Sequence, residues 1–469
     1  MTSTLSSANL DSVFHAYDIR GLDPQELDEK FFNRLGKAFV TFLGAKKIIV
    51  GQDIRKTGFK YKKAFMEGAT SLGCDVIDVR EIGTEMLYFA VGADKTIDGG
   101  ATITASHNPA GWNGCKMVGK ESIALSGDYG LPEIKDLMLK NNFSESVKEG
   151  IITQMDPYPD FKQKILSFIQ DTEIKPLKII VDAGNGIGGK LFDYIFGELP
   201  LKVTKMYFEP DDSFPNHVPN PMEEKNIREI RDRTVDTQAD IGIAIDGDAD
   251  RVFFLDNKGR NPSGIYTGTI FAKYLLRKNK GGTIIQDPRI TWPVTKEVEK
   301  AGGETIMIKA GHAFFKQKMK EMSGLFGAEA SSHFYYKDFY NADSGMITIA
   351  MMLKMLSEDL DFDEELSYLY STYPNSGEVN YLVDNSPETI STIEHYFTKN
   401  YPEAKVDRID GISIELGTWR FNLRSSNTQP LIRLNLEATD KSIIIDKFKE
   451  VEKLIKGQRD NDPELPELK

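Results

Sequence analysis

The sequence has 469 residues, of which 40% are hydrophobic and 28% charged, and its formal net charge is −13. A chain of this length exceeds one ordinary core, so several domains are expected. The acidic balance argues against nucleic acid as a partner, since a phosphate backbone needs a basic face. No apolar run approaches the roughly 18 residues of a membrane helix, no secretory signal opens the sequence, and two cysteines exclude a disulfide scaffold, which together predict a cytoplasmic protein with no membrane partner.

One strand–helix–strand pattern recurs three times along the chain. Strands that alternate with helical stretches are typical of βαβ units in α/β domains, and their recurrence predicts three related domains. The predicted strand pairs lie at 48–50 and 76–79, at 179–181 and 201–207, and at 283–285 and 304–308.

The end of the chain follows a different pattern. Hydrophobic and polar residues alternate over 419–423 and 432–437, which indicates strands with one solvated face. Helical stretches at 389–400 and 441–456 flank these strands, so a smaller α+β domain is expected. The predicted boundaries are 1–154, 155–258 and 259–372 for the three α/β domains and 373–469 for the last.

An acidic segment at 246–251, DGDADR, follows an apolar run at 241–245 that predicts a buried strand. In an extended segment, residues two apart point the same way, so Asp246, Asp248 and Asp250 converge and repel one another unless a cation lies between them. Oxygen-only ligation suits Mg²⁺. An EF-hand loop needs Gly at its sixth position and Glu at its twelfth, and this segment has neither. A solvated acidic turn is the simpler alternative, but strand ends in α/β domains are where ligands bind, which favours the metal.

A second chemical candidate is the loop at 104–109, TASHNP. Pro109 stops a helix from continuing, so Ser106 is expected on an exposed loop. Serine is a weak nucleophile unless it is activated or already phosphorylated, and the adjacent His107 imidazole is poorly placed to serve its own neighbour's hydroxyl. The absence of a Gly-x-Ser-x-Gly elbow around this serine argues against a serine hydrolase. A turn then brings Lys116 back toward the loop, although an ordinary surface lysine is the alternative.

A third candidate is the loop at 424–430 between the two alternating strands. It offers the Arg424 guanidinium, the hydroxyls of Ser426 and Thr428, and the Asn427 amide. This set matches the acceptors of a phosphate. An ordinary hairpin turn needs neither an arginine nor so many hydroxyls.

These segments, in this order, resemble the α-D-phosphohexomutase superfamily, and within it the phosphomannomutase/phosphoglucomutase group. The resemblance covers essentially the whole chain and implies the fold class: α/β, with three related α/β domains plus a smaller C-terminal α+β domain around a central cleft. The similar segments are 17–21 (YDIRG) at the opening, 104–109 for the catalytic serine loop, 113–116 (NGCK) after it, 246–251 for the metal loop, 327–333 (GAEASSH) for sugar recognition, and 424–430 for phosphate binding.

The resemblance implies an enzyme that interconverts hexose 6-phosphate and hexose 1-phosphate, of mannose and/or glucose, with a 1,6-bisphosphate intermediate. The resting enzyme would carry phosphoserine at Ser106, with Mg²⁺ held by Asp246, Asp248, Asp250 and a phosphoserine oxygen, and glucose 1,6-bisphosphate or an equivalent as activator. The catalytic group implied is Ser106, His107, Lys116, Arg20 and Arg251. The substrate-binding group implied is Tyr17, Arg289, His312, Glu329, Ser331, His333, Arg424, Ser426, Asn427 and Thr428.

Two of these residues, Arg20 and Lys116, are the acid/base candidates that the resemblance implies. Lysine is physically the easier base, because burial or a nearby cation can lower its pKa, whereas arginine has a pKa above about 12. We therefore expect Lys116 to transfer the proton and Arg20 to stabilise charge. Arg251 is expected to hold the phosphate that transfers.

Three positions depart from the group's pattern. Ser332 stands where glycine is usual, Ala310 where a hydroxyl residue is common, and Arg289 where lysine is common. None belongs to the phosphoryl chemistry, but all lie near sugar and phosphate recognition. The choice between mannose and glucose phosphates, which differ only at the C2 hydroxyl, therefore stays open.

Three rival functions share parts of this pattern. A phosphoglucosamine mutase has the same chemistry and differs in the sugar loop. A metal-dependent phosphomonoesterase would release phosphate to water, but one aspartate cluster argues against its two-metal form. A sugar-phosphate sensor built on an inactive mutase should have lost the serine or an aspartate, and all four are present.

Overall fold

The computed structural model describes residues 7–144, 146–425 and 431–463, and within these ranges the strands form four sheets. The chain divides into two compact units. Among the described residues, no helix is both long and apolar enough to cross a bilayer. The first unit comprises Met1–Asn261, His312–Lys320 and His333–Leu360, and the second comprises Pro262–Gly311, Glu321–Ser332 and Asp361–Lys469.

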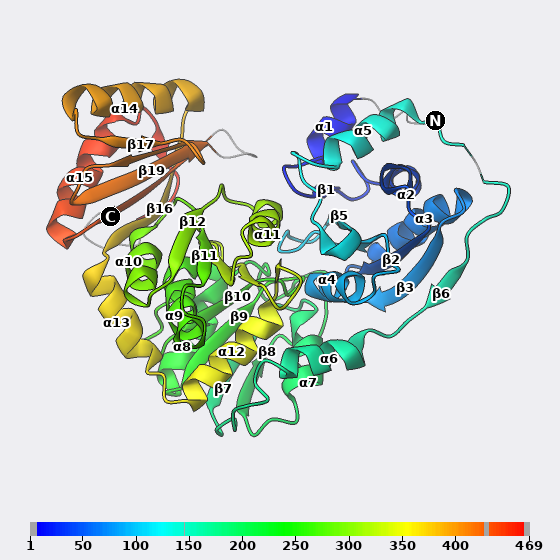
Figure 1. Cartoon of the computed structure of the whole chain (residues 1–469), viewed down its shortest axis with the longest axis horizontal. Coiled ribbons are helices and arrows are strands. Elements are labelled where there is room, and N and C mark those ends of the chain that lie inside the picture. The colour runs from blue at the N-terminus through cyan, green and yellow to red at the C-terminus, as the bar shows by residue number, and fades with distance from the viewer. Residues whose placement is uncertain (1–6, 145, 426–430, 464–469) are drawn as a thin grey trace. The chain divides into compact units, whose positions relative to one another are not determined.

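The first sheet of the first unit has the strand order β1-β5-β4-β2-β3-β6 (Figure 1). Its strands are β1 (Ile19–Leu22), β2 (Lys47–Gln52), β3 (Asp75–Glu81), β4 (Gly99–Ile103), β5 (Trp112–Gly119) and β6 (Ile152–Gln154). The helices of this region are α1 (Ser7–Val13), α2 (Glu29–Leu43), α3 (Gly58–Ser71), α4 (Thr84–Ala93), α5 (Leu131–Lys140) and α6 (Tyr158–Leu166).

Strand β2 lies in the middle of the parallel part of this sheet, between β3 and β4. The chain runs one way from β2 to β3 and then back past β2 to β4. Because such crossovers are right-handed, α3 and α4 must lie on opposite faces of the sheet. The carboxyl ends of β2 and β4 therefore lie side by side, and the loops that follow them meet there.

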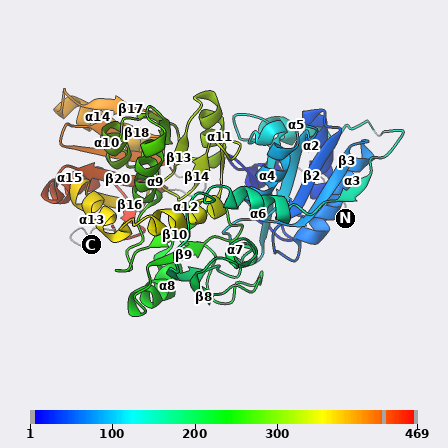
Figure 2. The same ribbon diagram turned by 60° about the horizontal axis from the view of Figure 1, so that its bottom comes forward.

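The second sheet, also in the first unit, repeats this arrangement. Its order is β10-β9-β7-β8, with β7 parallel to both β8 and β9. Figure 2 shows its two helices on either side of the strands. The elements are β7 (Lys178–Asp182), α7 (Gly188–Phe196), β8 (Lys202–Met206), α8 (Glu224–Asp236), β9 (Ile241–Ile245) and β10 (Val252–Leu255).

The second unit contains a third set with the same order, β12-β11-β13, again with the first strand of the set in the middle. The sequence-based prediction of three related α/β sets is therefore confirmed. The elements here are α9 (Gly264–Lys278), β11 (Thr283–Gln286), α10 (Trp292–Lys300), β12 (Glu304–Met307), β13 (Phe326–Ala328) and α13 (Phe362–Thr372). The interleaved segments of the first unit carry α11 (His312–Glu321), the hairpin β14 (Phe334–Tyr336) and β15 (Ala342–Asp343), and α12 (Gly345–Ser357).

The end of the second unit is an antiparallel sheet of order β17-β18-β19-β20-β16-β21. The predicted alternation places Phe421 and Leu434 in a core with Phe397 and Phe448 from the two helices, so both helices cover one face (Figure 1). The elements are β16 (Asn375–Leu382), α14 (Ser386–Asn400), β17 (Lys405–Asp407), β18 (Ile412–Glu415), β19 (Trp419–Ser425), β20 (Leu431–Ala438), α15 (Lys441–Leu454) and β21 (Gln458–Arg459).

The other face of these strands is not solvated, contrary to the prediction. Arg420 and Glu437 on this face are 3% and 1% exposed, and Arg420 Nη1 lies 2.6 Å from Glu437 Oε1. Glu437 also accepts from the Thr291 and Trp292 amides at the start of α10, and Arg420 donates to the Pro288 carbonyl. The polar residues alternate because they bind another segment of the same unit, not because they face water.

Candidate active site

Ser106 lies on the loop between β4 and β5, but it is buried at 2% exposure, so the prediction of an exposed serine is wrong. The reason is a close approach of the loop between β9 and β10. A Cβ atom added to Gly247 would lie 2.5 Å from the Ser106 carbonyl oxygen, closer than real Cβ atoms come. Glycine at this position therefore allows the 246–251 loop to cover the serine loop.

Ser106 has a left-handed backbone, with φ at 50°. In extended chain, neighbouring side chains point to opposite sides, but here the Ser106 hydroxyl and its neighbour's imidazole meet, with Oγ 3.1 Å from His107 Nδ1. The expectation that His107 is poorly placed to reach this hydroxyl is thus corrected. Burial and the nearby Arg251, Arg20 and Lys116 hold the pKa of His107 well below its ordinary range.

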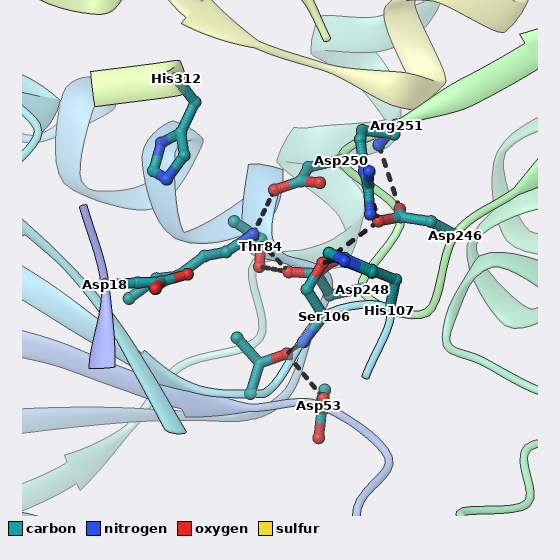
Figure 3. Close-up of polar contacts among 12 residues, drawn as sticks. Asp18, Asp53, Thr84, Ser106, His107, Asp246, Asp248, Asp250, Arg251 and His312 are labelled. Atoms are coloured by element: carbon teal, nitrogen blue, oxygen red, sulfur yellow. Dashed lines mark hydrogen bonds and ion pairs between the residues drawn. The ribbon is translucent and has the colours of Figure 1, made fainter. Parts of the chain in front are cut away.

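The three predicted metal ligands do converge beside this hydroxyl (Figure 3). Asp246, Asp248 and Asp250 are at most 1% exposed, and they offer ligand oxygens within 4.8 Å of one another. Ser106 Oγ donates to Asp246 Oδ2 at 3.2 Å. The convergence comes from a tight turn with Ala249 at φ 64°, not from the extended segment that the sequence argument assumed.

The electrostatics of this cluster fit a divalent cation. The pKa of Asp246 is raised to about 7, mainly by burial. The neighbouring Asp248 and Asp250 add to this shift, and Arg251 offsets it only in part. Asp248 Oδ1 is buried and has no hydrogen-bond partner among the described residues. A set of buried carboxylate oxygens that repel one another is the donor set that a hard cation such as Mg²⁺ prefers.

Lys116 bridges two of the aspartates. Its Nζ lies 2.7 Å from Asp248 Oδ2 and 2.5 Å from Asp250 Oδ2. Burial by itself lowers the Lys116 pKa, but the two carboxylates outweigh burial and raise the pKa well above its ordinary value. The argument for an easily deprotonated lysine is therefore wrong for this arrangement, in which Lys116 is an ammonium that can give a proton.

Two arginines complete the centre. Arg20, on β1, donates to Asp18 Oδ2 at 2.8 Å and to Asn108 Oδ1 at 2.7 Å. Arg251 donates through Nε to Asp246 Oδ2 at 2.9 Å, and its buried Nη2 has no hydrogen-bond partner among the described residues. A buried guanidinium nitrogen with an unused donor is suited to a phosphate oxygen.

Sequence reasoning missed the residues that hold the serine loop. Arg55, buried in the loop after β2, donates to four main-chain carbonyls of the serine loop and its flank, at distances of 2.6 to 3.0 Å: those of Ser106, Asn108, Pro109 and Trp112. Asp53 accepts from Thr104 Oγ1 at 2.7 Å, and that oxygen accepts from the Ser106 amide at 2.9 Å. Thr84 Oγ1 donates to Asp248 Oδ2 at 2.5 Å.

Three residues assigned to the sugar by resemblance also lie in the first unit. The Tyr17 and His312 rings meet edge to face at 4.8 Å, and the His312 and His333 ring centres are 6.0 Å apart. His333 Nε2 lies 3.6 Å from Asp250 Oδ1. The structure thus brings these rings together and links one of them to the aspartate cluster.

The second unit holds a separate group of the predicted residues. Arg289 donates twice to Asp287, at 2.9 and 2.7 Å, and its Nη2 lies 3.3 Å from Glu329 Oε1. Glu329 also accepts from the Gly311 amide at 3.0 Å. Arg289 therefore orients Glu329 in this structure. Ser331 follows Glu329 on the same loop and is half-buried.

Glu378 stands among three arginines of this unit. Its carboxylate lies 2.9 Å from Arg433 Nη1, 3.3 Å from Arg424 Nη2 and 4.0 Å from Arg289 Nη1. Burial raises the Glu378 pKa, but the three guanidiniums outweigh burial and lower it to about 2. Arg424 Nε and Arg433 Nε are buried and have no hydrogen-bond partner among the described residues, so donors that suit an anion remain here. The remaining predicted phosphate ligands, Ser426, Asn427 and Thr428, lie outside the described residues.

The backbone at position 332 explains why glycine is usual there. Ser332 has φ at 64°, a left-handed conformation that costs a residue with a Cβ roughly 1–2 kcal/mol. Replacing it with glycine is expected to raise the free energy of unfolding by about 0.5 kcal/mol, after the greater freedom of glycine in the unfolded chain is subtracted. Urea unfolding of both proteins measures the change. Ser332→Ala keeps the Cβ and should show no gain, whereas a destabilised Ser332→Gly would contradict the argument.

A histidine–aspartate pair lies at the carboxyl end of β7. His217 Nε2 is 2.9 Å from Asp182 Oδ2, and Nδ1 is 2.9 Å from the Val218 carbonyl. Burial lowers the His217 pKa, but Asp182 outweighs it and the net shift is upward. A raised pKa means that the pair stabilises the fold below the unfolded-state pKa of about 6.5, and this contribution is lost as pH rises through the folded-state pKa.

His217→Gln is therefore expected to cost on the order of 1 kcal/mol more at pH 5.5 than at pH 8.5. Chemical unfolding of the wild-type and variant proteins at both pH values gives the two differences. A cost that is equal at both pH values, or larger at the higher one, would refute the charged pair.

Models of one protein family match successive segments along the chain. The models of phosphoglucomutase/phosphomannomutase alpha/beta/alpha domains I, II and III match residues 11–145, 156–259 and 263–374. The model of the C-terminal domain matches residues 378–454. The four matches follow one another in the order expected from the resemblance.

Individual relatives and a solved structure indicate the same family. The chain is 38% identical over 458 residues to a phosphomannomutase of Vibrio cholerae, covering 95% of this chain and 98% of that one. It is 37% identical over 435 residues to a phosphomannomutase of Escherichia coli K12, covering 91% and 95%. A phosphoglucomutase/phosphomannomutase family structure from Burkholderia thailandensis superposes with a TM-score of 0.86 at 30% identity, covering 94% and 97%.

A more distant structure shares the fold. It is an N-acetylphosphoglucosamine mutase variant from Aspergillus fumigatus in complex with glucose 1,6-bisphosphate, with a TM-score of 0.56 at 13% identity, covering 97% of this chain and all of that one. With four domain matches and relatives above 35% identity over nearly the full length, the chain belongs to the phosphoglucomutase/phosphomannomutase family of phosphohexomutases.

Proposed function

We propose that this phosphohexomutase interconverts the 6- and 1-phosphates of mannose and/or glucose through a phosphoserine at Ser106. The observation that carries the proposal is the 3.2 Å approach of Ser106 Oγ to Asp246 Oδ2, at the edge of a buried cluster of three carboxylates. A nucleophilic oxygen beside a cation site is the arrangement that phosphoryl transfer needs.

In the first half-reaction, a hydroxyl oxygen of the sugar monophosphate attacks the phosphorus of phosphoserine. The bond between phosphorus and Ser106 Oγ breaks, and the sugar becomes a 1,6-bisphosphate. The attacking hydroxyl loses its proton to a base, and the serine oxygen takes one up. Lys116, held as an ammonium 2.7 Å and 2.5 Å from Asp248 and Asp250, is the group we assign to give the serine oxygen its proton. The amine so formed takes up the proton that the attacking hydroxyl loses, so the step leaves the number of protons on the enzyme unchanged. Arg20 and Arg251 stabilise the phosphoryl charge.

In the second half-reaction, the bisphosphate turns over and presents its other phosphate to the same oxygen. Ser106 Oγ loses its proton and attacks that phosphorus, the bond to the sugar oxygen breaks, the sugar oxygen takes up a proton, and the isomerised monophosphate leaves. The orphaned Nη2 of Arg251 is a donor for the phosphate in transit in both directions. Because one centre serves both ends of the sugar, the site for the other phosphate must accept either end.

The second unit supplies recognition in this proposal. Glu329, oriented by Arg289 and the Gly311 amide, accepts hydrogen bonds from sugar hydroxyls together with Ser331. Arg424, one of the arginines around Glu378, begins the loop for the non-reacting phosphate. His312 and His333 of the first unit contact the sugar, with Tyr17 beside them.

We assign Mg²⁺ to Asp246, Asp248 and Asp250, where it would withdraw negative charge from the phosphoryl group. A 1,6-bisphosphate serves as activator, because it phosphorylates Ser106 if that residue loses its phosphate, and the distant Aspergillus fumigatus relative was solved with glucose 1,6-bisphosphate. We also assign the enzyme to the cytoplasm, since its two cysteines, Cys74 and Cys115, are buried and form no disulfide.

Phosphorus NMR tests the function directly. The protein is mixed with Mg²⁺, a trace of glucose 1,6-bisphosphate, and either mannose 1-phosphate or glucose 1-phosphate. The 6-phosphates are expected to appear with little free phosphate, a chelator is expected to stop the reaction, and the ratio of the two rates gives the sugar preference. Inorganic phosphate as the only product would support a phosphomonoesterase instead, and no change with either sugar would refute the proposal.

A further inference from the structure

A fully buried lysine lies beside the His312 ring in the first unit. Lys316 is 4% exposed and comes one turn after His312 on α11, so both side chains lie on one face of the helix. Lys316 Nζ is 2.6 Å from Asp343 Oδ1, 3.3 Å from His312 Nδ1 and 3.6 Å from the centre of the Tyr88 ring. Burial lowers the pKa of Lys316, and the Asp343 carboxylate opposes that shift only in part, so the net shift is downward. A carboxylate and an aromatic face thus stabilise the buried ammonium.

The ammonium determines which nitrogen of His312 carries the proton. A lysine ammonium has three donors and no acceptor, so the 3.3 Å contact requires a lone pair on His312 Nδ1. A neutral imidazole has a single N–H, which is then on Nε2. Burial and the neighbouring Lys316 hold the pKa of His312 well below its ordinary range, which keeps the ring neutral.

His312 Nε2 is the end of the ring that remains for a ligand. It is buried and has no hydrogen-bond partner among the described residues. A buried polar atom without a partner is costly, so a bound molecule that supplies one is favoured. In Figure 3 the ring points from α11 toward the side of the site marked by Asp18. The Tyr17 and His333 rings lie beside it, at 4.8 and 6.0 Å between centres.

We propose that Lys316 is a positioning residue that fixes His312 as an Nε2–H donor to an oxygen of the bound sugar phosphate. The ligand in this inference rests on the proposed function, whereas the position of the proton does not. His312 then takes no proton from a sugar hydroxyl and is not a base. A hydroxyl or phosphate oxygen satisfies the donor, and a cationic amino substituent at the same place does not.

The first test is spectroscopic and needs no turnover. In Ser106→Ala protein labelled with ¹⁵N-histidine, long-range ¹H–¹⁵N correlation spectra distinguish rings protonated at Nδ1, at Nε2 or at both. The chain has six histidines, and loss of one ring in the additional variant His312→Gln assigns the signal. At neutral pH we expect His312 to be protonated at Nε2 only. A ring protonated at Nδ1, or at both nitrogens, would overturn the inference.

The same sample tests the ligand. Saturating mannose 1-phosphate or glucose 1-phosphate is expected to shift the Nε2 proton, and no shift with either would overturn the ligand assignment. Inorganic phosphate is the probe that separates the two sources of oxygen. A shift with phosphate as well as with the sugar phosphates identifies a phosphate oxygen, and a shift with the sugar phosphates alone identifies a hydroxyl oxygen.

Substitution of the lysine tests its role. In Lys316→Met, rings protonated at Nδ1 are expected to appear, and the KM for the sugar phosphate is expected to rise about tenfold with kcat within about threefold, as for an interaction made equally in the ground and transition states. Lys320→Met is the matched control, because Lys320 lies on the same helix and pairs on the surface with Glu121 at 2.8 Å. An unchanged KM and an unchanged ring in Lys316→Met would refute the positioning role.

These outcomes separate the two proposals. If Lys316→Met does not fold, the spectrum with intact Lys316 still decides where the proton is. An Nε2–H ring in a protein without mutase activity would refute the proposed function and not the tautomer. Mutase activity in a protein whose His312 ring is protonated at Nδ1 would refute the tautomer and not the proposed function.

Discussion

Ser106→Ala is expected to lower mutase turnover by about 10⁴-fold or more, because the variant has no oxygen to carry the phosphoryl group. Turnover is measured by phosphorus NMR with Mg²⁺ and saturating glucose 1,6-bisphosphate. Transfer of labelled phosphate from the bisphosphate to the protein, followed on the intact chain, gives a second readout, and this labelling is expected to disappear as well.

The matched control is Ser71→Ala, which removes a serine hydroxyl from the same unit. Within the described part of the chain, Ser71 Oγ donates only to the Gly68 carbonyl of its own helix, at 2.8 Å, so both turnover and labelling should persist. Equal thermal unfolding of the two variants excludes a folding defect in Ser106→Ala. Near-normal turnover in Ser106→Ala would show that the phosphoryl group is carried elsewhere.

Gly247→Ala is expected to lower turnover by about 10²-fold while the protein remains folded. The added Cβ would lie 2.5 Å from the Ser106 carbonyl oxygen and 3.1 Å from Pro219 Cγ, so the loop at 246–251 must move away from the serine loop. Ser106 Oγ then separates from the carboxylates, and displacements of about 1 Å at a reaction centre cost rates of this size. The kinetic assay with sugar 1-phosphate and Mg²⁺ measures the loss.

Gly58→Ala provides the matched control for this prediction. A Cβ at Gly58 would meet Gln52 Cβ at 3.4 Å, an ordinary contact, and Gly58 lies at the start of a helix in the same unit. Gly58→Ala is expected to keep full turnover. Wild-type turnover in Gly247→Ala would mean that the two loops do not need the close approach seen here.

The sequence predicted the α/β repeat and the aspartate cluster, because both depend on local patterns. The strand Ile241–Ile245 and the acidic run after it are adjacent in the chain, so their proximity needs no knowledge of the fold. The same local reasoning gave the wrong geometry at Ala249, whose left-handed backbone has no signature in the sequence.

The residues that sequence reasoning missed act through distant partners. Arg55 binds carbonyl oxygens more than 50 positions later in the chain, and carbonyls are present at every residue, so no pattern marks them. The contacts of Lys316 could not be predicted for the same reason, since Asp343 and Tyr88 approach it from other elements. The buried polar face of Arg420 and Glu437 was likewise misread as solvated, because alternation does not distinguish water from another segment of protein.

The hydrogen bonds from Arg55 to the serine loop determine which partner moves between the two half-reactions. One guanidinium binds four main-chain carbonyls of the serine loop and its flank, so the loop holds Ser106 in a fixed position. A loop held in this way keeps the same conformation whether the phosphoryl group is on Ser106 or on the sugar. The sugar bisphosphate must then reorient between the two half-reactions. The forward and reverse reactions use the same placement of Ser106.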